Sequence, residues 1–299
     1  MKSFVKMVFI FLLALPLVGQ ANHSWNGYHW ARIKPNLIEF PNNPYRFDLK
    51  VVDNLTPDWK TSLDIAKGDW NTPQKFDLVP FNNLTTPVNL VVVNGFYPNK
   101  KCNTVTGTTQ VCNSAYGRNG WLGLATIYIT GGVHITKGTA KMNDSYFNSN
   151  FPKYNNPNER LHVLCQEVAH TFGLGHQSEN FNLSLDTCMD YSSSTPDDDS
   201  SSHPNEHDFV MLNSIYNHYD SFNSYSTTST PALAMGPDPV DHGDPNSWGQ
   251  LVSQSRDGRS STYERVHGPQ SKSVTEVYWT EETAEDCRSC DHRFHHDEE

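Results

Sequence analysis

Long apolar stretches are almost absent from this sequence. No segment reaches the roughly 20 apolar residues that a membrane-spanning helix needs. The longest apolar run, Met7–Val18, is shorter, follows Lys2 and Lys6, and precedes small residues that end at Ala21. A charged start, a short apolar run and a small-residue cleavage site are typical of a signal peptide. We therefore expect residues 1–21 to be removed from a secreted protein that has no membrane span.

Basic residues are scarce as well. The chain has 22 Lys and Arg against 33 Asp and Glu, which gives a net charge of −11. A surface of this sign repels the phosphates of nucleic acids and of anionic lipids, so neither is an expected partner. With 299 residues and no internal repeat, the chain is long enough for one or two domains with a sizeable core.

Cysteine is limited to six residues, which an exported chain can pair as disulfides. Six cysteines allow 15 pairings, and their layout favours three local ones. One pair flanks a Gly/Thr-rich turn, one flanks a long loop, and one lies near the end of the chain. These pairs are Cys102–Cys112, Cys165–Cys188 and Cys287–Cys290. Cys165 could instead be a free buried thiol, and the last pair, a C-x-x-C, lacks the second half of a zinc ribbon.

The patterning of apolar residues predicts an α+β fold. Alternating or β-branched runs predict strands, and Gly131-Gly132 predicts a hairpin turn between the last two. Apolar residues at helical spacing after Ser/Thr/Asn caps predict three helices. The expected strands are 45–51, 88–93, 123–130 and 134–140, and the expected helices start at Pro57 and cover 157–172 and 206–218.

Composition divides the rest of the chain into four parts. Residues 22–220 form the main domain, and 221–245 read as a Ser/Thr/Pro-rich linker. Residues 246–280 predict a small C-terminal β meander. The charged, His-rich residues 281–299 are expected to be disordered. Aromatic residues of the meander could bind carbohydrate, although packing within a small sheet is the simpler interpretation; they are Trp248, Tyr263, Tyr278 and Trp279.

The most informative stretch is CQEVAHTFGLGH, which holds Glu167, His170, Gly173 and His176. These four residues have the spacing of the zinc-protease motif H-E-x-x-H-x-x-G-x-x-H, with Gln166 in place of the first histidine. On a helix, Gln166 and His170 face the same way. Gly173 lets the chain turn back with His176, and Glu167 can take a proton from a metal-bound water.

A second motif, Cys188-Met189-Asp190-Tyr191, follows downstream. With both motifs, residues 25–220 resemble the metzincin clan of zinc endopeptidases, closest to its matrixin-like members. The resemblance implies a twisted, mostly parallel sheet, an active-site helix, a turn in which Met189 lies beneath the metal, and a C-terminal helix. It also implies that Tyr191 reaches the zinc or the oxyanion, as in astacins and serralysins.

Further implications concern substrate and latency. An extended protein or peptide substrate would pair with the strand at Leu122–Ile127. The cysteine-switch sequence of matrixins is absent, and no familiar propeptide fits between Ala21 and the first strand. Cys165–Cys188 would tie the active-site helix to the methionine turn.

Gln166 decides how far the resemblance extends. An amide oxygen can bind zinc but suits it less well than imidazole does. His162 lies eight residues from His170, about 12 Å along a helix, which is too far to share the ion. Four further histidines match no ligand position: His134, His203, His207 and His218.

The expected ligands of Zn²⁺ are therefore Gln166, His170 and His176. The sequence predicts a secreted zinc endopeptidase with Glu167 as general base, because a purely structural protein has no need of a carboxyl group there. The alternative is an inactive pseudopeptidase that acts as an extracellular binding or structural protein. The Asp197–Asp199 run could bind Ca²⁺, although such runs are usually solvated loops.

Overall fold

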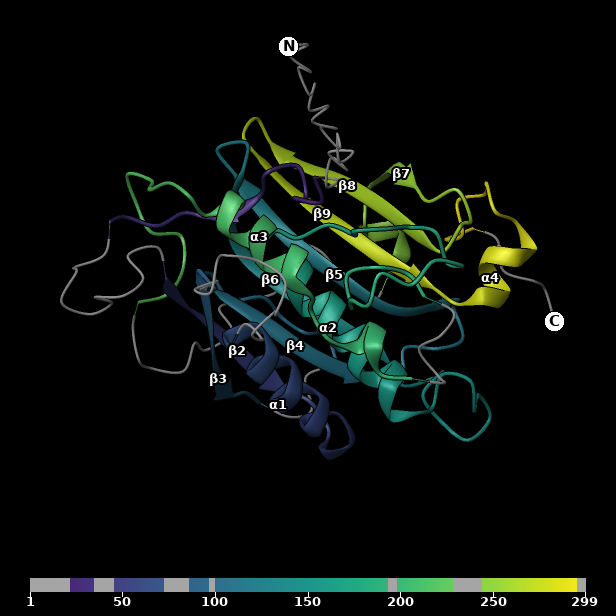
Figure 1. Ribbon diagram of the computed structural model, residues 1–299. Helices are drawn as coiled ribbons and strands as arrows, with labels where there is room; N and C mark the ends of the chain where they lie inside the picture. Colours follow the sequence, from purple (N-terminus) through teal and green to yellow (C-terminus); the bar gives the residue numbers. More distant parts are fainter. Residues whose placement is uncertain are drawn as a thin grey trace, which may run out of the picture.

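The computed structural model describes six stretches of the chain (Figure 1), which are residues 22–34, 46–72, 86–96, 100–192, 198–227 and 244–294. The predicted signal peptide and residues 228–243 of the predicted linker lie outside them. Among the described helices, none combines the length and the apolar character needed to cross a bilayer.

One mixed sheet forms the centre of the fold, with strand order β3-β2-β4-β6-β5-β9-β8-β7 and β1 paired to β6. Four strand pairs are parallel: β3–β2, β2–β4, β4–β6 and β1–β6. The other four are antiparallel: β6–β5, β5–β9, β9–β8 and β8–β7. The predicted α+β class is confirmed at this level. The strands are β1 (His29–Trp30), β2 (Phe47–Asn54), β3 (Val88–Asn94), β4 (Thr108–Ser114), β5 (Trp121–Thr130), β6 (His134–Asn143), β7 (Gln250–Gln254), β8 (Ser260–Gly268) and β9 (Ser271–Trp279).

Two helices, α1 (Pro57–Asn71) and α2 (Pro157–His170), lie on one face of the sheet (Figure 1). α2 contacts α1 as well as β5 and β6, so it is buried along most of its length. The apolar face predicted for the first helix is confirmed, since Trp59, Leu63 and Trp70 are buried in the main core. Two more helices follow, α3 (Glu206–Ile215) and α4 (Glu281–Asp286).

The start of α2 differs from the predicted capping box. Asn156 caps the helix by accepting a hydrogen bond from the backbone N–H of Glu159 at 2.9 Å. The Glu159 side chain does not complete the box but is buried, near Arg259 and Lys153. Burial raises the pKa of Glu159 to about 7, against the opposing effect of the two cations.

This buried carboxyl predicts a pH-dependent stability. The folded state holds a proton on Glu159 up to about pH 7, whereas the unfolded chain releases it near pH 4.5. Stability therefore falls as pH rises through this window. Glutamine does not titrate, so Glu159→Gln should not lose this stability. Between pH 4.5 and 7 its free energy of unfolding should therefore rise by about 3 kcal/mol relative to that of native protein, as measured by urea unfolding. The control is Glu285→Gln, because Glu285 is exposed. If the free energies of unfolding of native protein and Glu159→Gln changed in parallel with pH, the prediction would be contradicted.

The C-terminal strands do not form a separate unit. The predicted meander exists as β7, β8 and β9, but β9 pairs with β5 along nine registered residue pairs and so extends the central sheet. A second apolar cluster covers this junction. It joins residues of β5 to the C-terminal strands and contains Trp121, Leu124, Trp248, Tyr263, Val277 and Trp279. The aromatic residues considered for carbohydrate binding are therefore packing residues.

The prediction of disorder is wrong for residues 281–294. They form α4, a disulfide between Cys287 and Cys290, and a terminal turn. His292 is buried against the Trp279 ring, with 5.1 Å between ring centroids, and its Nε2 donates to the Gly258 carbonyl oxygen at 2.9 Å. The charged composition of this segment predicted disorder because it offers few apolar side chains. The segment is ordered because the sheet provides a surface on which it packs.

Candidate active site

Helix α2 supplies three residues of the predicted site, Gln166, Glu167 and His170, and all three are buried. The helix ends at His170, and Gly173 then turns the chain with a φ of +101°. A Cβ at this glycine would collide with the carbonyl oxygen of Tyr28, so the turn requires glycine for both its backbone angle and its close packing. The turn predicted from the motif is thus present.

The turn brings His176 against His170. Their Nε2 atoms lie 3.0 Å apart, and the two rings are perpendicular. The other nitrogen of His170, Nδ1, lies 2.8 Å from the Leu174 carbonyl oxygen and donates to it, which leaves the Nε2 lone pair directed toward His176. Burial, together with His176, holds the pKa of His170 well below its usual value.

These two imidazoles fit a zinc ion. Donor atoms about 2.0–2.1 Å from a tetrahedral zinc are separated by about 3.3 Å, close to the 3.0 Å between His170 and His176. A neutral imidazole whose second nitrogen is held by a carbonyl is also the usual form of a histidine ligand.

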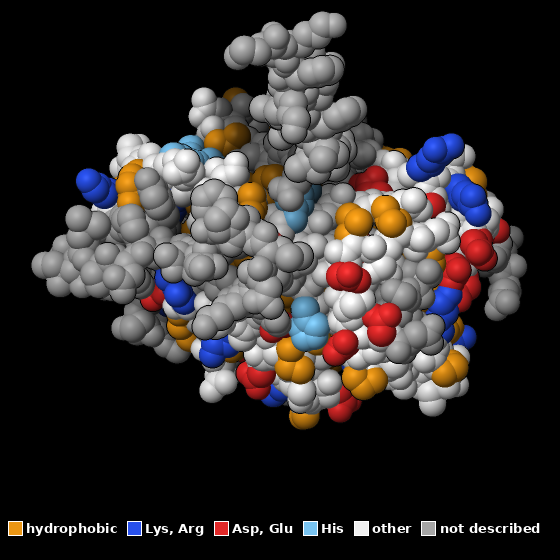
Figure 2. All heavy atoms as spheres, viewed as in Figure 1, with side chains coloured by type: hydrophobic (Ala, Val, Ile, Leu, Met, Phe, Trp, Pro, Cys, Tyr) orange, Lys and Arg blue, Asp and Glu red, His pale blue; other side chains and the backbone are white. Residues whose placement is uncertain are grey.

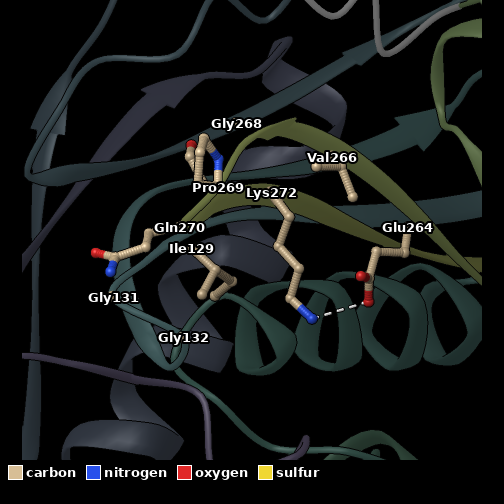
Figure 3. Close-up of a pocket in the computed structure, with 10 residues that line it drawn as sticks. Ile129, Gly131, Gly132, Glu264, Val266, Gly268, Pro269, Gln270 and Lys272 are labelled. Carbon is tan, nitrogen blue, oxygen red and sulfur yellow. Dashed lines mark hydrogen bonds and ion pairs between the residues drawn. The ribbon is translucent and has the colours of Figure 1, made fainter.

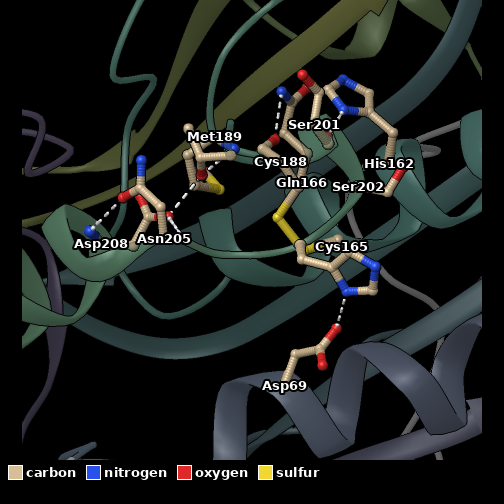
Figure 4. The surroundings of a disulfide bond; sticks show 12 residues. Asp69, His162, Cys165, Gln166, Cys188, Met189, Ser201, Ser202, Asn205 and Asp208 are labelled. Carbon is tan, nitrogen blue, oxygen red and sulfur yellow. Dashed lines mark hydrogen bonds and ion pairs between the residues drawn. A yellow bond between two sulfur atoms is a disulfide. The ribbon is translucent and has the colours of Figure 1, made fainter. Parts of the chain in front are cut away.

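Gln166 has a role that the sequence did not predict. Its amide Nε2 donates to the carbonyl oxygen of Cys188 at 2.9 Å (Figure 4). The same nitrogen also donates to the carbonyl oxygen of Asp190 at 3.2 Å. Its Oε1 is buried and has no hydrogen-bond partner among the described residues. The side chain therefore fastens the loop of residues 188–191 to α2 through its amide nitrogen and leaves Oε1 unpaired among the described residues.

A disulfide reinforces the same junction. Cys165 of α2 is bonded to Cys188, as predicted, and Met189 is fully buried in the main core (Figure 4). Tyr191 follows with its ring centroid 4.5 Å from that of His176. Tyr191 thus lies beside His176, one of the two facing histidines. The other two predicted disulfides are present as well.

The carboxyl group of Glu167 is buried beneath β5. A Cβ at Gly123 would approach its Oε1 to 2.6 Å, so the strand passes directly over it. Burial raises the pKa of Glu167 well above its usual value, and the nearby Glu276 adds to this effect.

Glu276 of β9 is a site residue that the sequence analysis missed. It is buried, its Oε1 lies 4.0 Å from Nδ1 of His176, and its Oε2 accepts a hydrogen bond from Thr262 at 2.5 Å. One signal was available, because alternation in VTEVYW places Glu276 on the same strand face as the core residues Val274 and Tyr278.

The strand edge expected to receive substrate is occupied. Within Leu122–Ile127, residues 123–127 pair antiparallel with residues 274–278 of β9. The Tyr278 ring, from β9, also packs 4.7 Å from that of Tyr191. Together with Glu276, these contacts close the site, so the expectation of an open edge is wrong for this form of the protein.

Two features among the described surface residues lie away from the candidate active site, a cavity and an exposed aspartate. A cavity of about 520 Å³ lies at the β5–β6 and β8–β9 turns, and its charged residues Lys272 and Glu264 pair with each other at 2.9 Å (Figure 3). On the face shown in Figure 2, acidic side chains lie among neutral ones and no broad basic patch forms. Asp197 lies outside the described residues, and the carboxylate of exposed Asp198 accepts hydrogen bonds from Ser200.

One of the histidines that matched no ligand position, His134, lies in a different group. Atoms of His29, His134 and Asp220 come within 4.8 Å of one another and could hold a metal ion. Two other candidates are engaged elsewhere: His162 Nδ1 lies 2.5 Å from the Ser201 carbonyl oxygen, and His203 Nδ1 lies 2.7 Å from Asp69.

No family model, curated protein or solved structure matches this chain. The functional interpretation therefore depends on the residues of the site.

Proposed function

We propose that the chain is a secreted, metzincin-like zinc endopeptidase in a closed form. The observation that carries the proposal is the pair of facing imidazoles, His170 and His176, with the buried carboxyl group of Glu167 on the same helix three residues before His170. Packing alone gives no reason to bury two histidine nitrogens face to face beside an acid. Three disulfides fit the oxidising conditions met by exported proteins.

Each residue has a role in the proposed reaction. His170, His176 and Oε1 of Gln166 would hold zinc, which when bound would polarise the scissile carbonyl group and a water molecule. With β9 and its Glu276 displaced, the Glu167 carboxyl group ionises, and it then accepts a proton from water and passes it to the leaving amine. Tyr191 donates a hydrogen bond to the developing oxyanion. Substrate must replace β9 along β5 before any of this can occur.

The second candidate function is a pseudopeptidase, and the Gln166 hydrogen bonds favour it. An amide already fastened to two carbonyl groups can be retained for structure alone. In that case the same buried site would stabilise an extracellular binding protein without cleaving anything.

Zinc binding by Gln166 variants separates the two functions. We expect Gln166→His to tighten zinc binding about tenfold or more, because imidazole replaces an amide oxygen. Gln166→Ala should weaken it, and isothermal titration with zinc measures both. His162→Gln, a change of a buried α2 histidine one turn earlier, is the matched control and should leave zinc affinity unchanged. Equal affinity in native protein, Gln166→His and Gln166→Ala would exclude Gln166 as a ligand.

A further inference from the structure

A cluster of three histidines and one aspartate lies outside the proposed active site. His29 belongs to β1, His134 begins β6, and His218 and Asp220 follow α3. Oδ1 of Asp220 lies 3.2 Å from Nε2 of His134, 3.6 Å from Nε2 of His29 and 3.7 Å from Nε2 of His218. The Nε2 atoms of His29 and His218 are 3.1 Å apart. We call these four residues the histidine–aspartate cluster.

Neighbouring backbone groups orient the donor atoms of the cluster. Nδ1 of His29 donates to the Gly27 carbonyl oxygen at 2.8 Å, so its Nε2 faces the cluster as an acceptor. Oδ2 of Asp220 accepts from the backbone N–H of Arg32 at 2.9 Å, which leaves Oδ1 for the cluster. Ligands of metal ions are commonly fixed by such outer hydrogen bonds.

We propose that the histidine–aspartate cluster binds a structural zinc ion. Imidazole nitrogen with one carboxylate oxygen suits zinc, whereas calcium and magnesium prefer sites made of oxygen. Four of the six separations among these donor atoms, 3.1–3.7 Å, bracket the value of about 3.3 Å expected between donors of a tetrahedral zinc. His29, His134 and Asp220 form the core of the site, with all three donor atoms within 4.8 Å of one another, and the half-exposed His218 lies on its outer side, against His29 and Asp220.

Such an ion would join three segments that are far apart in the sequence. β1 and its flanks also pack on the turn that positions His176. The Trp30 indole donates to the carbonyl oxygen of Thr171 at 2.9 Å. The backbone N–H of Trp25 donates to the carbonyl oxygen of Gly173 at 2.8 Å. From the other segment, Tyr216 donates to the Phe172 carbonyl oxygen at 2.9 Å. Zinc in the cluster would thus brace the active-site turn from outside.

Zinc content of the full chain tests the proposal. After chelation and dialysis against zinc, we expect His134→Gln/Asp220→Asn to hold about one zinc ion fewer per chain than native protein, measured by atomic absorption. The difference should persist in a His176→Ala background, so the result does not depend on the proposed active site. The matched control is His203→Gln/Asp69→Asn, which removes another histidine–aspartate pair and should keep the native zinc content.

A second measurement uses the native chain alone and guards against a variant that does not fold. Chelator should lower the melting temperature, and added zinc should restore it, in both native protein and His176→Ala. Equal zinc content in native protein and His134→Gln/Asp220→Asn would overturn the proposal. So would a melting temperature of His176→Ala that changes neither with chelator nor with added zinc. Either result would mean that the cluster is only a hydrogen-bonded network around Asp220.

Discussion

Replacing Val277 by aspartate is expected to raise cleavage of an unstructured protein substrate by about a hundredfold. Val277 is buried in the second apolar cluster, on the face of β9 opposite Glu276 and Tyr278. A carboxylate there weakens the docking of β9 without touching a site residue. Burying this carboxylate without a partner costs at least about 3 kcal/mol in the closed form. The equilibrium between the closed form and the form with β9 released therefore shifts about a hundredfold toward release.

Hydrolysis and hydrogen exchange together measure this effect. Backbone amides of β5 and β9 should lose protection in Val277→Asp, while circular dichroism retains the native helix content. Val266→Asp is the matched control, because Val266 is 71% exposed on neighbouring β8 and takes the same charge without burial. Loss of protection in β5 without any gain in cleavage would show that the C-terminal strands do not restrain a peptidase.

The position of β9 makes this prediction possible. An uncovered strand edge invites pairing with any extended chain, and a protease of the proposed type uses this property to hold substrate. In the closed form the chain fills that edge with its own residues 271–279. Under the proposed function, this closure by the C-terminal strands would keep substrate from the site until β9 is released.

Local signals in the sequence predicted the elements that build the site. Pro57 and Pro157 mark the starts of α1 and α2 as expected, and the Gly131-Gly132 hairpin joins β5 to β6. The three disulfides also pair as predicted, because each joins cysteines close in sequence. Each of these features depends on neighbouring residues, and a single sequence displays such information directly.

Features that depend on distant residues could not be predicted. The β5–β9 pairing joins strands about 150 residues apart, and no periodicity reveals which edge a strand will choose. The histidine–aspartate cluster likewise gathers residues 29, 134, 218 and 220, whose spacing matches no metal motif. β4 was missed because TTQVCNS is polar, although its residues from Thr108 to Asn113 are all buried.

Replacing Glu167 by glutamine is expected to abolish hydrolysis while leaving zinc binding unchanged. General-base catalysis contributes about 10²–10⁴-fold, and glutamine keeps the shape of the side chain but cannot accept the proton. The variant is best made in the Val277→Asp chain, in which β9 is released and the activity is large enough to measure its loss. We expect kcat to fall by about a thousandfold with little change in KM, since Glu167 acts on water and not on substrate binding.

Glu276→Gln in the same chain is the matched control for Glu167→Gln. It removes a second buried carboxyl group near His176, but one carried by β9, which must leave before substrate enters. Hydrolysis should therefore survive in Glu276→Gln and disappear in Glu167→Gln. If both variants cleaved as fast as their parent, Glu167 would not be the general base. If the parent bound zinc and exposed β5 but cleaved nothing, the buried acid and histidines would belong to a pseudopeptidase, in which the Gln166 hydrogen bonds serve structure alone.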